Sequence, residues 1–308
     1  MHEIVILSGK GGSGKTSVTG ALARILSKEE KIVICDYDVD APDLHILLRP
    51  TQTVRQDFVS GRLARFNPER CIDCAQCLAF CRFDAISRTD DGAYPVCESA
   101  CEGCAVCVKL CPVGAFDFEP RHCGEHYRSE TRFGPFVHAA LTPGAENSGR
   151  LITLLKSVAR DTARETGAEL ILSDGTPGIG CPVISSLSGA SLVCAVVEAT
   201  ASGAADFERL ADLCRHFRLP IAVIINKADL HPSATEQVRE AAQKAGAEIL
   251  GEVPFTPQFT RAMVKAEVLG ETPCPLDSLF EDFARRLKES VSRASRTRPV
   301  IPIKEIQK

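Results

Sequence analysis

The cysteines between positions 71 and 111 are the residues whose spacing most directly indicates chemistry. The 308-residue chain contains 15 cysteines, and most of them lie in this short stretch. Such a dense group of thiols predicts a metal or cluster site rather than disulfides in a reducing compartment. Two runs share the spacing C-x2-C-x2-C-x3-C: Cys71, Cys74, Cys77 and Cys81, and then Cys101, Cys104, Cys107 and Cys111.

This spacing predicts two [4Fe–4S] clusters that exchange one ligand. In the bacterial ferredoxin pattern, three thiolates of each run bind one cubane and the fourth cysteine binds the other. Pro112 completes this pattern after the second run, whereas Arg82 follows the first, so the turn there and the potential of that cluster are expected to differ. Zinc is the main alternative, but the crossed repeat favours iron. One cluster is expected on Cys71, Cys74, Cys77 and Cys111, and the other on Cys81, Cys101, Cys104 and Cys107.

A glycine-rich segment near the start of the chain, GKGGSGKT at Gly9–Thr16, carries a second kind of chemistry. It matches G-x-x-x-x-G-K-S/T and lies between an apolar run and a helix expected at about 15–27, so it predicts a phosphate-binding loop. Lys15 is expected to contact the β- and γ-phosphates, and the Thr16 hydroxyl to bind Mg²⁺. The expected nucleotide-binding residues of this segment are Gly9, Lys10, Gly11, Gly12, Ser13, Gly14, Lys15, Thr16 and Ser17.

The elements that must hold these residues follow an alternating pattern. Short apolar runs alternate with helical segments, which predicts a doubly wound α/β fold with a mostly parallel sheet. The cysteine stretch interrupts this pattern and is expected to form a small inserted α+β domain of the bacterial ferredoxin kind. The expected strands cover residues 3–8, 31–36, 134–141, 168–175, 191–199, 221–227 and 247–255, and the expected helices include 148–165 and 276–291. The expected domains are 1–62 and 121–292 for the two parts of the nucleotide-binding domain, 63–120 for the insert, and 293–308 for a basic tail that is extended or frayed.

Composition and charge exclude some classes of function. A formal net charge of −4 gives no electrostatic case for nucleic acid as the main partner. No apolar run reaches the roughly 18 residues that cross a bilayer. The N-terminus lacks the layout of a signal peptide, so a cytoplasmic protein is expected. The basic amphipathic C-terminus could bind a membrane surface, but a closing helix packed on the sheet is the favoured interpretation.

Acidic residues lie where two of the expected strands end. Asp36, Asp38 and Asp40 occupy the end of the second strand and the segment after it, where the Mg²⁺ and the attacking water of a bound nucleotide would lie. Asp43 lies in the same segment, and acidic caps on the following turn are the structural alternative. Asp174 ends another expected strand.

The segment KGGSGKT resembles the deviant Walker A loop of the MinD/ParA/Mrp and nitrogenase iron-protein superfamily, which are P-loop ATPases of the SIMIBI type. The resemblance implies ATP as the nucleotide and a dimer in which Lys10 reaches the partner's nucleotide and neutralises charge on the transferred phosphoryl group. Lys10, Lys15 and Asp38 are then the expected catalytic residues, with Asp38 orienting the attacking water. The expected magnesium site comprises Thr16, Asp36 and Asp174.

Two further segments resemble nucleotide-sensing parts of the same superfamily. DGTPGIG resembles the second switch, in which Gly178 would sense the γ-phosphate. IINKAD resembles the base-reading segment, in which Asn226 would bind adenine, and Pro254 matches a position near the adenine. Asp229 leaves guanine recognition of the N-K-x-D type open, but the two-lysine loop favours ATP.

The chain as a whole resembles the MinD-superfamily ATPases that contain an inserted ferredoxin domain. The resemblance covers nearly the whole chain and includes GPFVHAALTPGAENSGRLI and DGTPGIGCPVI. Members are typical of anaerobic bacteria and archaea and often occur as adjacent paired genes, which implies a homodimer or a heterodimer with a paralogous ATPase. A redox partner is also implied, and a small protein like the nitrogenase-cofactor carriers, the orange-protein type, is one that the resemblance suggests.

These features predict an ATP-hydrolysing dimeric switch that couples nucleotide state to electron transfer or metallocluster handling. A MinD-like positioning ATPase with a structural or sensory insert is one alternative. An Mrp-type iron–sulfur carrier is another, although Cys274 lacks the second cysteine of a C-x2-C pair. Cys181 matches the position of a bridging-cluster ligand in nitrogenase iron proteins, but no second ligand is evident. His122, Cys123 and His126 form a weaker third-metal candidate, for which ordinary loop residues are the favoured interpretation.

Overall fold

The computed structural model describes residues 1–297 and divides into two compact units. The nucleotide unit comprises residues 1–55 and 126–140 and the chain from Ser148 onward, and the cysteine unit comprises residues 56–125 and 141–147. The insert expected at 63–120 lies inside the cysteine unit, which extends further on both sides. Two long strands that the sequence did not predict, β3 (Thr51–Phe66) and β4 (Phe116–Thr131), contribute residues to both units.

Within residues 1–297, the strands form a nine-stranded sheet with the order β3-β4-β5-β2-β6-β1-β7-β8-β9. The neighbouring strands from β5 to β9 are all parallel, so the expected mostly parallel α/β sheet is confirmed. Strands that are covered on both faces have nearly continuous apolar sequences, which is why they were recognisable. The strands of this part are β1 (His2–Ser8), β2 (Ile32–Asp36), β5 (Gly134–Leu141), β6 (Leu170–Pro177), β7 (Leu192–Glu198), β8 (Ile221–Asn226) and β9 (Glu248–Val253).

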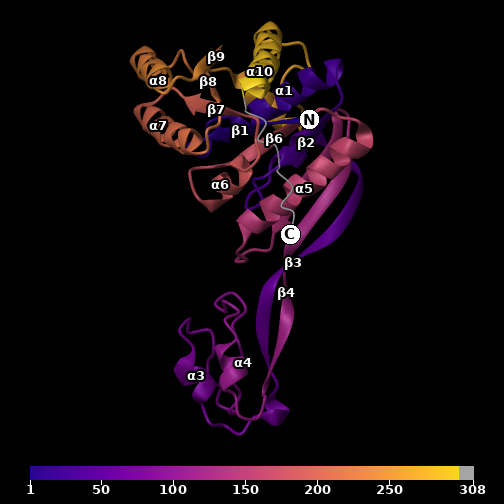
Figure 1. Ribbon diagram of the computed structural model, residues 1–308, viewed down its shortest axis with the longest axis vertical. Coiled ribbons are helices and arrows are strands. Elements are labelled where there is room, and N and C mark those ends of the chain that lie inside the picture. Colours follow the sequence, from indigo (N-terminus) through magenta and orange to yellow (C-terminus); the bar gives the residue numbers. More distant parts are fainter. Residues whose placement is uncertain (298–308) are drawn as a thin grey trace, which may run out of the picture. The chain divides into compact units, whose positions relative to one another are not determined.

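Helices cover both faces of the parallel part of the sheet (Figure 1). In β1, Ile4 and Ile6 pack in the core that contains α1, α2 and α10, whereas Val5 and Leu7 pack in the core that contains α6, α7 and α8. Because successive side chains of a strand point to opposite faces, one short apolar run supplies both cores. The helices of this unit are α1 (Lys15–Glu29), α2 (Leu44–Leu48), α5 (Ser148–Thr166), α6 (Cys181–Leu187), α7 (Ala201–His216), α8 (Pro232–Lys244), α9 (Pro257–Val264) and α10 (Asp277–Thr297).

The cysteine unit is built from short elements around a small core. The buried apolar residues of this core include Ala64, Ile86, Tyr94 and Phe116, and several cysteines of both runs pack against them. A unit of this size buries little apolar surface, so metal ligation is a common source of additional stability in such units. Its helical segments are η1 (Pro68–Arg70), α3 (Gln76–Phe80) and α4 (Val106–Leu110).

The end of α10 corrects one prediction. The helix continues to Thr297, so the expectation of an extended or frayed tail is wrong for residues 293–297. Ser290 donates a hydrogen bond to Glu248 Oε2 at 2.6 Å, and Arg293 pairs with the same oxygen, which ties the last turns to β9. The rest of the expected tail, residues 298–308, lies outside the described residues. None of the helices within residues 1–297 offers the long apolar stretch that a membrane crossing requires.

Candidate nucleotide site and cysteine cavities

The glycine-rich loop 9–14 joins β1 to the start of α1. Gly14 has a φ of 93°, in the left-handed region that favours glycine, and a Cβ at this position would lie 2.4 Å from Asn226 Nδ2. The amide of Asn226 donates a hydrogen bond to the carbonyl oxygen of Ser13 at 2.7 Å. The end of β8 therefore holds the loop closely, next to the unpaired N–H groups with which a helix N-terminus binds anions.

Lys15 is the positive centre of the candidate nucleotide site. Its Nζ lies 2.9 Å from Asp174 Oδ2 and 3.8 Å from Asp38 Oδ2. Asp174 also accepts hydrogen bonds from the hydroxyls of Thr16, at 2.7 Å, and Thr19, at 2.8 Å. Asp36 and Asp174 are paired in the parallel register of β2 and β6, so the sheet itself brings both carboxylates to the edge where the loop lies.

Burial shapes the electrostatics of this group. Burial, together with the negative charge of Asp174, raises the pKa of Asp36 well above its usual range. Burial also raises the pKa of Asp38, against the opposing effect of Lys15. For Lys15, burial opposes protonation, but the neighbouring carboxylates, Asp174 first, raise its pKa. One basic side chain therefore faces three acidic side chains.

These groups fit a magnesium ion that is bound together with a nucleotide. Lys15 faces the carboxylates of Asp36, Asp38 and Asp174, so the site has an excess of acidic oxygens. Mg²⁺ prefers such oxygen ligands and shares them with phosphates and water. Asp40, by contrast, is exposed, so the structure favours Asp38 among the acidic residues of this segment. The ligand roles of Thr16, Asp36 and Asp174 remain predictions.

Lys10 is paired within its own chain. Its Nζ lies 2.7 Å from Glu198 Oε2, and Lys227 Nζ lies 2.7 Å from the other oxygen of the same carboxylate. Glu198 was not predicted as a site residue, although an acidic residue at the end of a parallel strand beside a phosphate loop is a recognisable signal. To act on a partner's nucleotide, as predicted, Lys10 must leave this pair.

The remaining residues predicted to contact the nucleotide are distributed around the loop. Asn226 is 5% exposed and uses its amide to hold Ser13, so the predicted contact with adenine is not needed to explain its burial. Asp229 accepts a hydrogen bond from the N–H of Phe255 at 2.5 Å, next to the exposed Pro254. The N–H of Gly178 donates to the carbonyl oxygen of Ser8 at 2.9 Å, which places the predicted second switch beside the end of β1. The other predicted contact, Ser17, lies near the start of α1, and its Oγ is 3.5 Å from Met263 Sδ.

In the cysteine unit, the two cysteine runs line two cavities. Each cavity contains three cysteines of one run and the last cysteine of the other. This is the grouping that the crossed assignment requires, although ligation itself remains a prediction. Apolar groups complete the walls, which limits the access of water to whatever the cavities hold. The first cavity is lined by Cys71, Cys74, Cys77 and Cys111, with Tyr94 and Phe116, and the second by Cys81, Cys101, Cys104 and Cys107, with Phe83 and Ile86.

The backbone of the two runs shows the same unusual conformations at equivalent places. Ala75 and Ala105 have φ angles of 57° and 62°, each one residue after the second cysteine of its run. Left-handed backbone is costly for a residue with a side chain, and such strain is concentrated at functional sites. Two sulfurs accept backbone N–H groups: Cys71 from Asp73 at 3.4 Å and Cys111 from Ala115 at 3.2 Å. Hydrogen bonds to ligating sulfurs are among the features that set the reduction potential of a bound cluster.

Two glycines with the same backbone conformation allow a test of whether the second cavity needs a glycine in its wall. Gly103 and Gly114 share a φ of 63°, but a Cβ at Gly103 would lie 2.3 Å from the carbonyl oxygen of Arg62, whereas one at Gly114 would meet nothing within 4 Å. We expect Gly103→Ala to lose about half of the iron of the anaerobically purified protein, because one of two cubanes is disturbed. Gly114→Ala, with the same backbone cost, should retain nearly all of it. Equal iron in the two variants would contradict the expectation.

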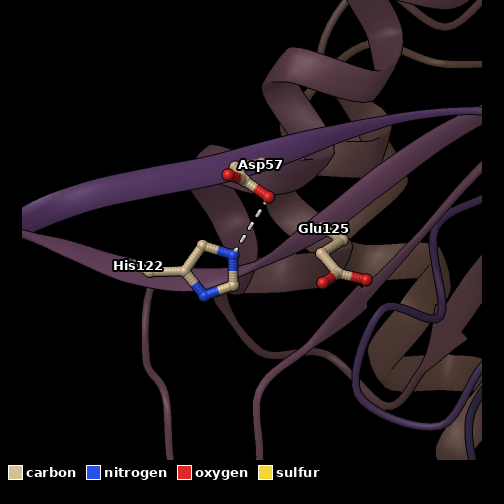
Figure 2. A group of neighbouring side chains, drawn as sticks. All are labelled: Asp57, His122 and Glu125. Carbon is tan, nitrogen blue, oxygen red and sulfur yellow. Dashed lines mark ion pairs between the residues drawn. The ribbon is translucent and has the colours of Figure 1, made fainter.

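The third-metal candidate is not assembled as the sequence suggested. His122, Cys123 and His126 lie on the strand β4, not in a loop. Cys123 is buried and its thiol donates to the carbonyl oxygen of Ser60, away from any shared site. His122 instead lies beside Asp57 and Glu125, and its Nε2 is 3.5 Å from Asp57 Oδ1 (Figure 2). Because the side chains of His122 and Asp57 are 46% and 65% exposed, this group is an ordinary cluster of polar surface side chains.

The cysteines outside the two runs are mostly packing residues. Cys35, Cys194 and Cys214 are buried in the nucleotide unit. Burial raises the pKa of Cys194 and of Cys214 to about 12, which keeps both thiols protonated. Cys181 is exposed at the first residue of α6, and a bridging role for it remains a prediction.

A glycine-rich loop at the carboxyl edge of a parallel sheet, with a lysine and several carboxylates converging on it, defines a P-loop nucleotide-binding protein. Residues 4–269 match the family model described as the CobQ/CobB/MinD/ParA nucleotide binding domain. The chain belongs to this family. The MinD/ParA part of the predicted resemblance is thereby confirmed.

Several known proteins are similar to this chain. The uncharacterized proteins MJ0578 and MJ0579 of Methanocaldococcus jannaschii are 34% identical over 229 residues and 22% identical over 236 residues, covering 79% and 80% of those proteins and 74% of this chain in each case. The pyruvate synthase subunit PorD of the same organism is 30% identical over 72 residues, 23% of this chain and 84% of PorD. MinD of Pyrococcus horikoshii complexed with Mg-ADP has the same fold, with a TM-score of 0.58 and 15% identity over 95% of this chain and 98% of that one.

Proposed function

We propose that this protein is an ATP-hydrolysing dimeric switch that carries two [4Fe–4S] clusters and couples its nucleotide state to electron transfer or metallocluster handling with a redox partner. The observation that carries the proposal is the grouping of the cysteines: the eight that sequence assigned to two crossed clusters line two cavities, four in each. The same chain has a phosphate loop whose Lys15 lies beside the carboxylates of Asp38 and Asp174.

The nucleotide site supports hydrolysis of ATP. Phosphate oxygens would replace the carboxylates of Asp174 and Asp38 at Lys15, because a buried ammonium must keep a negative partner. Asp38 would then be released to orient the attacking water, and positioning rather than strong base chemistry is what this reaction requires. Thr16, Asp36 and Asp174 would hold Mg²⁺, which neutralises charge on the β- and γ-phosphates. Asp229 is engaged with the backbone of Phe255, which fits adenine better than guanine recognition.

The cysteine unit supports cluster binding. A 72-residue match covers 84% of the pyruvate synthase subunit PorD, so part of this chain is similar to most of a separate subunit. When bound, [4Fe–4S] clusters transfer single electrons at low potential. Apolar residues such as Tyr94, Phe116 and Phe83 line the two cavities and would control the access of water, which is one way that a protein tunes such potentials.

The dimer and the partner are part of the proposal. Lys10 is the residue that would act across the dimer interface, once it leaves Glu198. Two relatives with consecutive designations, MJ0578 and MJ0579, both match this chain, which supports a heterodimer of paralogous ATPases beside the homodimer. A small carrier of the orange-protein type is one candidate for the redox partner.

Anaerobic spectroscopy with and without ATP tests this function. We expect the anaerobically purified protein to be brown and to contain about eight irons per chain, as two cubanes require. Addition of ATP and Mg²⁺ should change the reduction rate or the potential of the clusters. A colourless, iron-free protein would contradict the cluster assignment, and clusters that ignore ATP would contradict the coupling.

A MinD-like positioning ATPase is the second candidate, because solved MinD structures share the fold over nearly the whole chain. Sedimentation with lipid vesicles in the presence of ATP separates the two, since an electron relay has no need to bind lipid. An Mrp-type carrier has less support. Cys274 has no partner cysteine in a C-x2-C pair, and its thiol donates to Gln258 Oε1 at 2.6 Å.

A further inference from the structure

The nucleotide unit contains a buried charge pair that has no role in the chemistry described above. Glu3, on β1, and Lys156, on α5, are each 4% exposed, and Lys156 Nζ lies 2.6 Å from Glu3 Oε1. Removing two charges from water costs several kcal/mol, and well-packed apolar residues of similar volume are often at least as stable. Stability alone is therefore a weak reason for this pair.

The pair contacts the segment that carries Asp38. Tyr37, between Asp36 and Asp38, is fully buried, and its hydroxyl donates to Glu3 Oε1 at 2.7 Å. Lys156 Nζ also lies 4.8 Å from the centre of the Tyr37 ring, within the range of a cation–π contact. A movement of the Asp38 segment must therefore shift the ring, the hydroxyl bond or both.

The same ammonium contacts α6. Lys156 Nζ donates a hydrogen bond to the carbonyl oxygen of Ser186 at 2.6 Å, in the last turn of that helix. A cation at this end of a helix is favourable, because the last carbonyl groups have no partner within the helix. The other end of α6 is Cys181, three residues after Gly178, directly after the short loop 178–180 that follows β6, the strand of Asp174.

We propose that Lys156, held by Glu3, is a positioning residue that couples two segments that follow strands ending near Lys15: residues 37–43, after β2, through Tyr37, and α6, after β6, through Ser186. Asp38, in the first segment, and Asp174, on the strand β6 that precedes α6, both pair with Lys15, so a change at Lys15 when phosphates replace these carboxylates reaches the first segment directly and α6 through the end of β6. One buried ammonium can satisfy both only in a restricted set of arrangements, so a change in one segment biases the other. The inference rests on the proposed nucleotide-dependent switch and adds the residues that link its two parts.

Hydrogen exchange in the presence of AMPPNP tests the coupling without requiring hydrolysis. In the natural protein, AMPPNP with Mg²⁺ should slow amide exchange both at residues 37–44 and at residues 181–188. The double variant Glu3→Gln/Lys156→Met removes both charges, so neither is left buried and unpaired. We expect AMPPNP to slow exchange at residues 37–44 as in the natural protein, and the slowing at residues 181–188 to be about tenfold smaller. A tenfold change corresponds to a typical coupling energy. The rate of ATP hydrolysis should fall more than the KM for ATP rises.

Two further variants complete the experiment. Tyr37→Phe removes only the hydroxyl and leaves the charge pair intact, so it should show the same loss in α6, smaller in size, even if the double variant does not fold. Cys214→Ala, a buried change in α7 away from this network, should retain the slowing in both segments. An unchanged response of α6 in Tyr37→Phe and the double variant, an equal loss in Cys214→Ala, or an α6 that never responds in the natural protein would overturn the proposal. A protein that binds AMPPNP but does not hydrolyse ATP would instead contradict the proposed function. Hydrogen exchange with AMPPNP would still test the coupling in that case.

Discussion

Replacement of Lys10 by alanine is expected to lower ATP hydrolysis by roughly 10³-fold while leaving ATP binding and iron content nearly intact. The reason is that a cation supplied across an interface stabilises charge that develops only in the transition state, as arginine fingers do. Lys15 and the loop backbone, which bind the ground-state phosphates, are untouched by the change. Phosphate release and calorimetric titration with ATP measure the two effects separately.

Lys227→Ala is the matched control, because Lys227 pairs with the same Glu198 carboxylate at the same 2.7 Å distance. Both variants leave one lysine on Glu198, so any effect that comes only from the broken ion pair should be equal in the two. We expect Lys227→Ala to lower hydrolysis by less than about tenfold, the size of a lost exposed or half-buried pair. A Lys10→Ala protein that hydrolyses ATP at the natural rate would contradict the role of Lys10 in the partner's site.

Pairs of cysteine substitutions are expected to distinguish crossed from uncrossed ligation. Cys74→Ser/Cys111→Ser changes two residues of the first cavity, whereas Cys104→Ser/Cys111→Ser changes one residue of each cavity. If the ligands are crossed, the first variant should retain about four irons per chain and the second close to none, because each cubane needs all of its ligands.

Ligation within each run predicts the opposite order, since Cys104 and Cys111 would then serve one cluster and Cys74 another. Iron analysis and electron paramagnetic resonance of the reduced protein measure the outcome. Each variant contains two serines in place of two cysteines, so each serves as the control for the other. Equal iron in the two variants would contradict both arrangements.

The sequence by itself determined the class of fold and the position of the phosphate loop, and it predicted the grouping of the cysteines. A phosphate loop can be recognised from the sequence because its residues are close along the chain: the glycines, Lys15 and Thr16 lie within eight positions of one another. Apolar runs buried on both faces of a parallel sheet likewise carry a local signal, and so β1, β2 and β5 to β9 were recognised. The grouping of cysteines into two crossed sets also followed from spacing. By contrast, β3 and β4, with many exposed residues in β3, have no such signal, and they were not predicted.

Only the tertiary structure decided which acidic residues face Lys15 and what Lys10 contacts. The register of β2 against β6 brings Asp36 to Asp174 across more than a hundred residues of sequence, and it leaves Asp40 exposed. Glu198 pairs with Lys10 for the same reason, since parallel strands that are distant in sequence end at one edge of the sheet. No local sequence pattern predicts the buried pair of Glu3 and Lys156. Each of these contacts joins residues that no spacing relates, because the order of strands in a sheet is set by the packing of the whole chain.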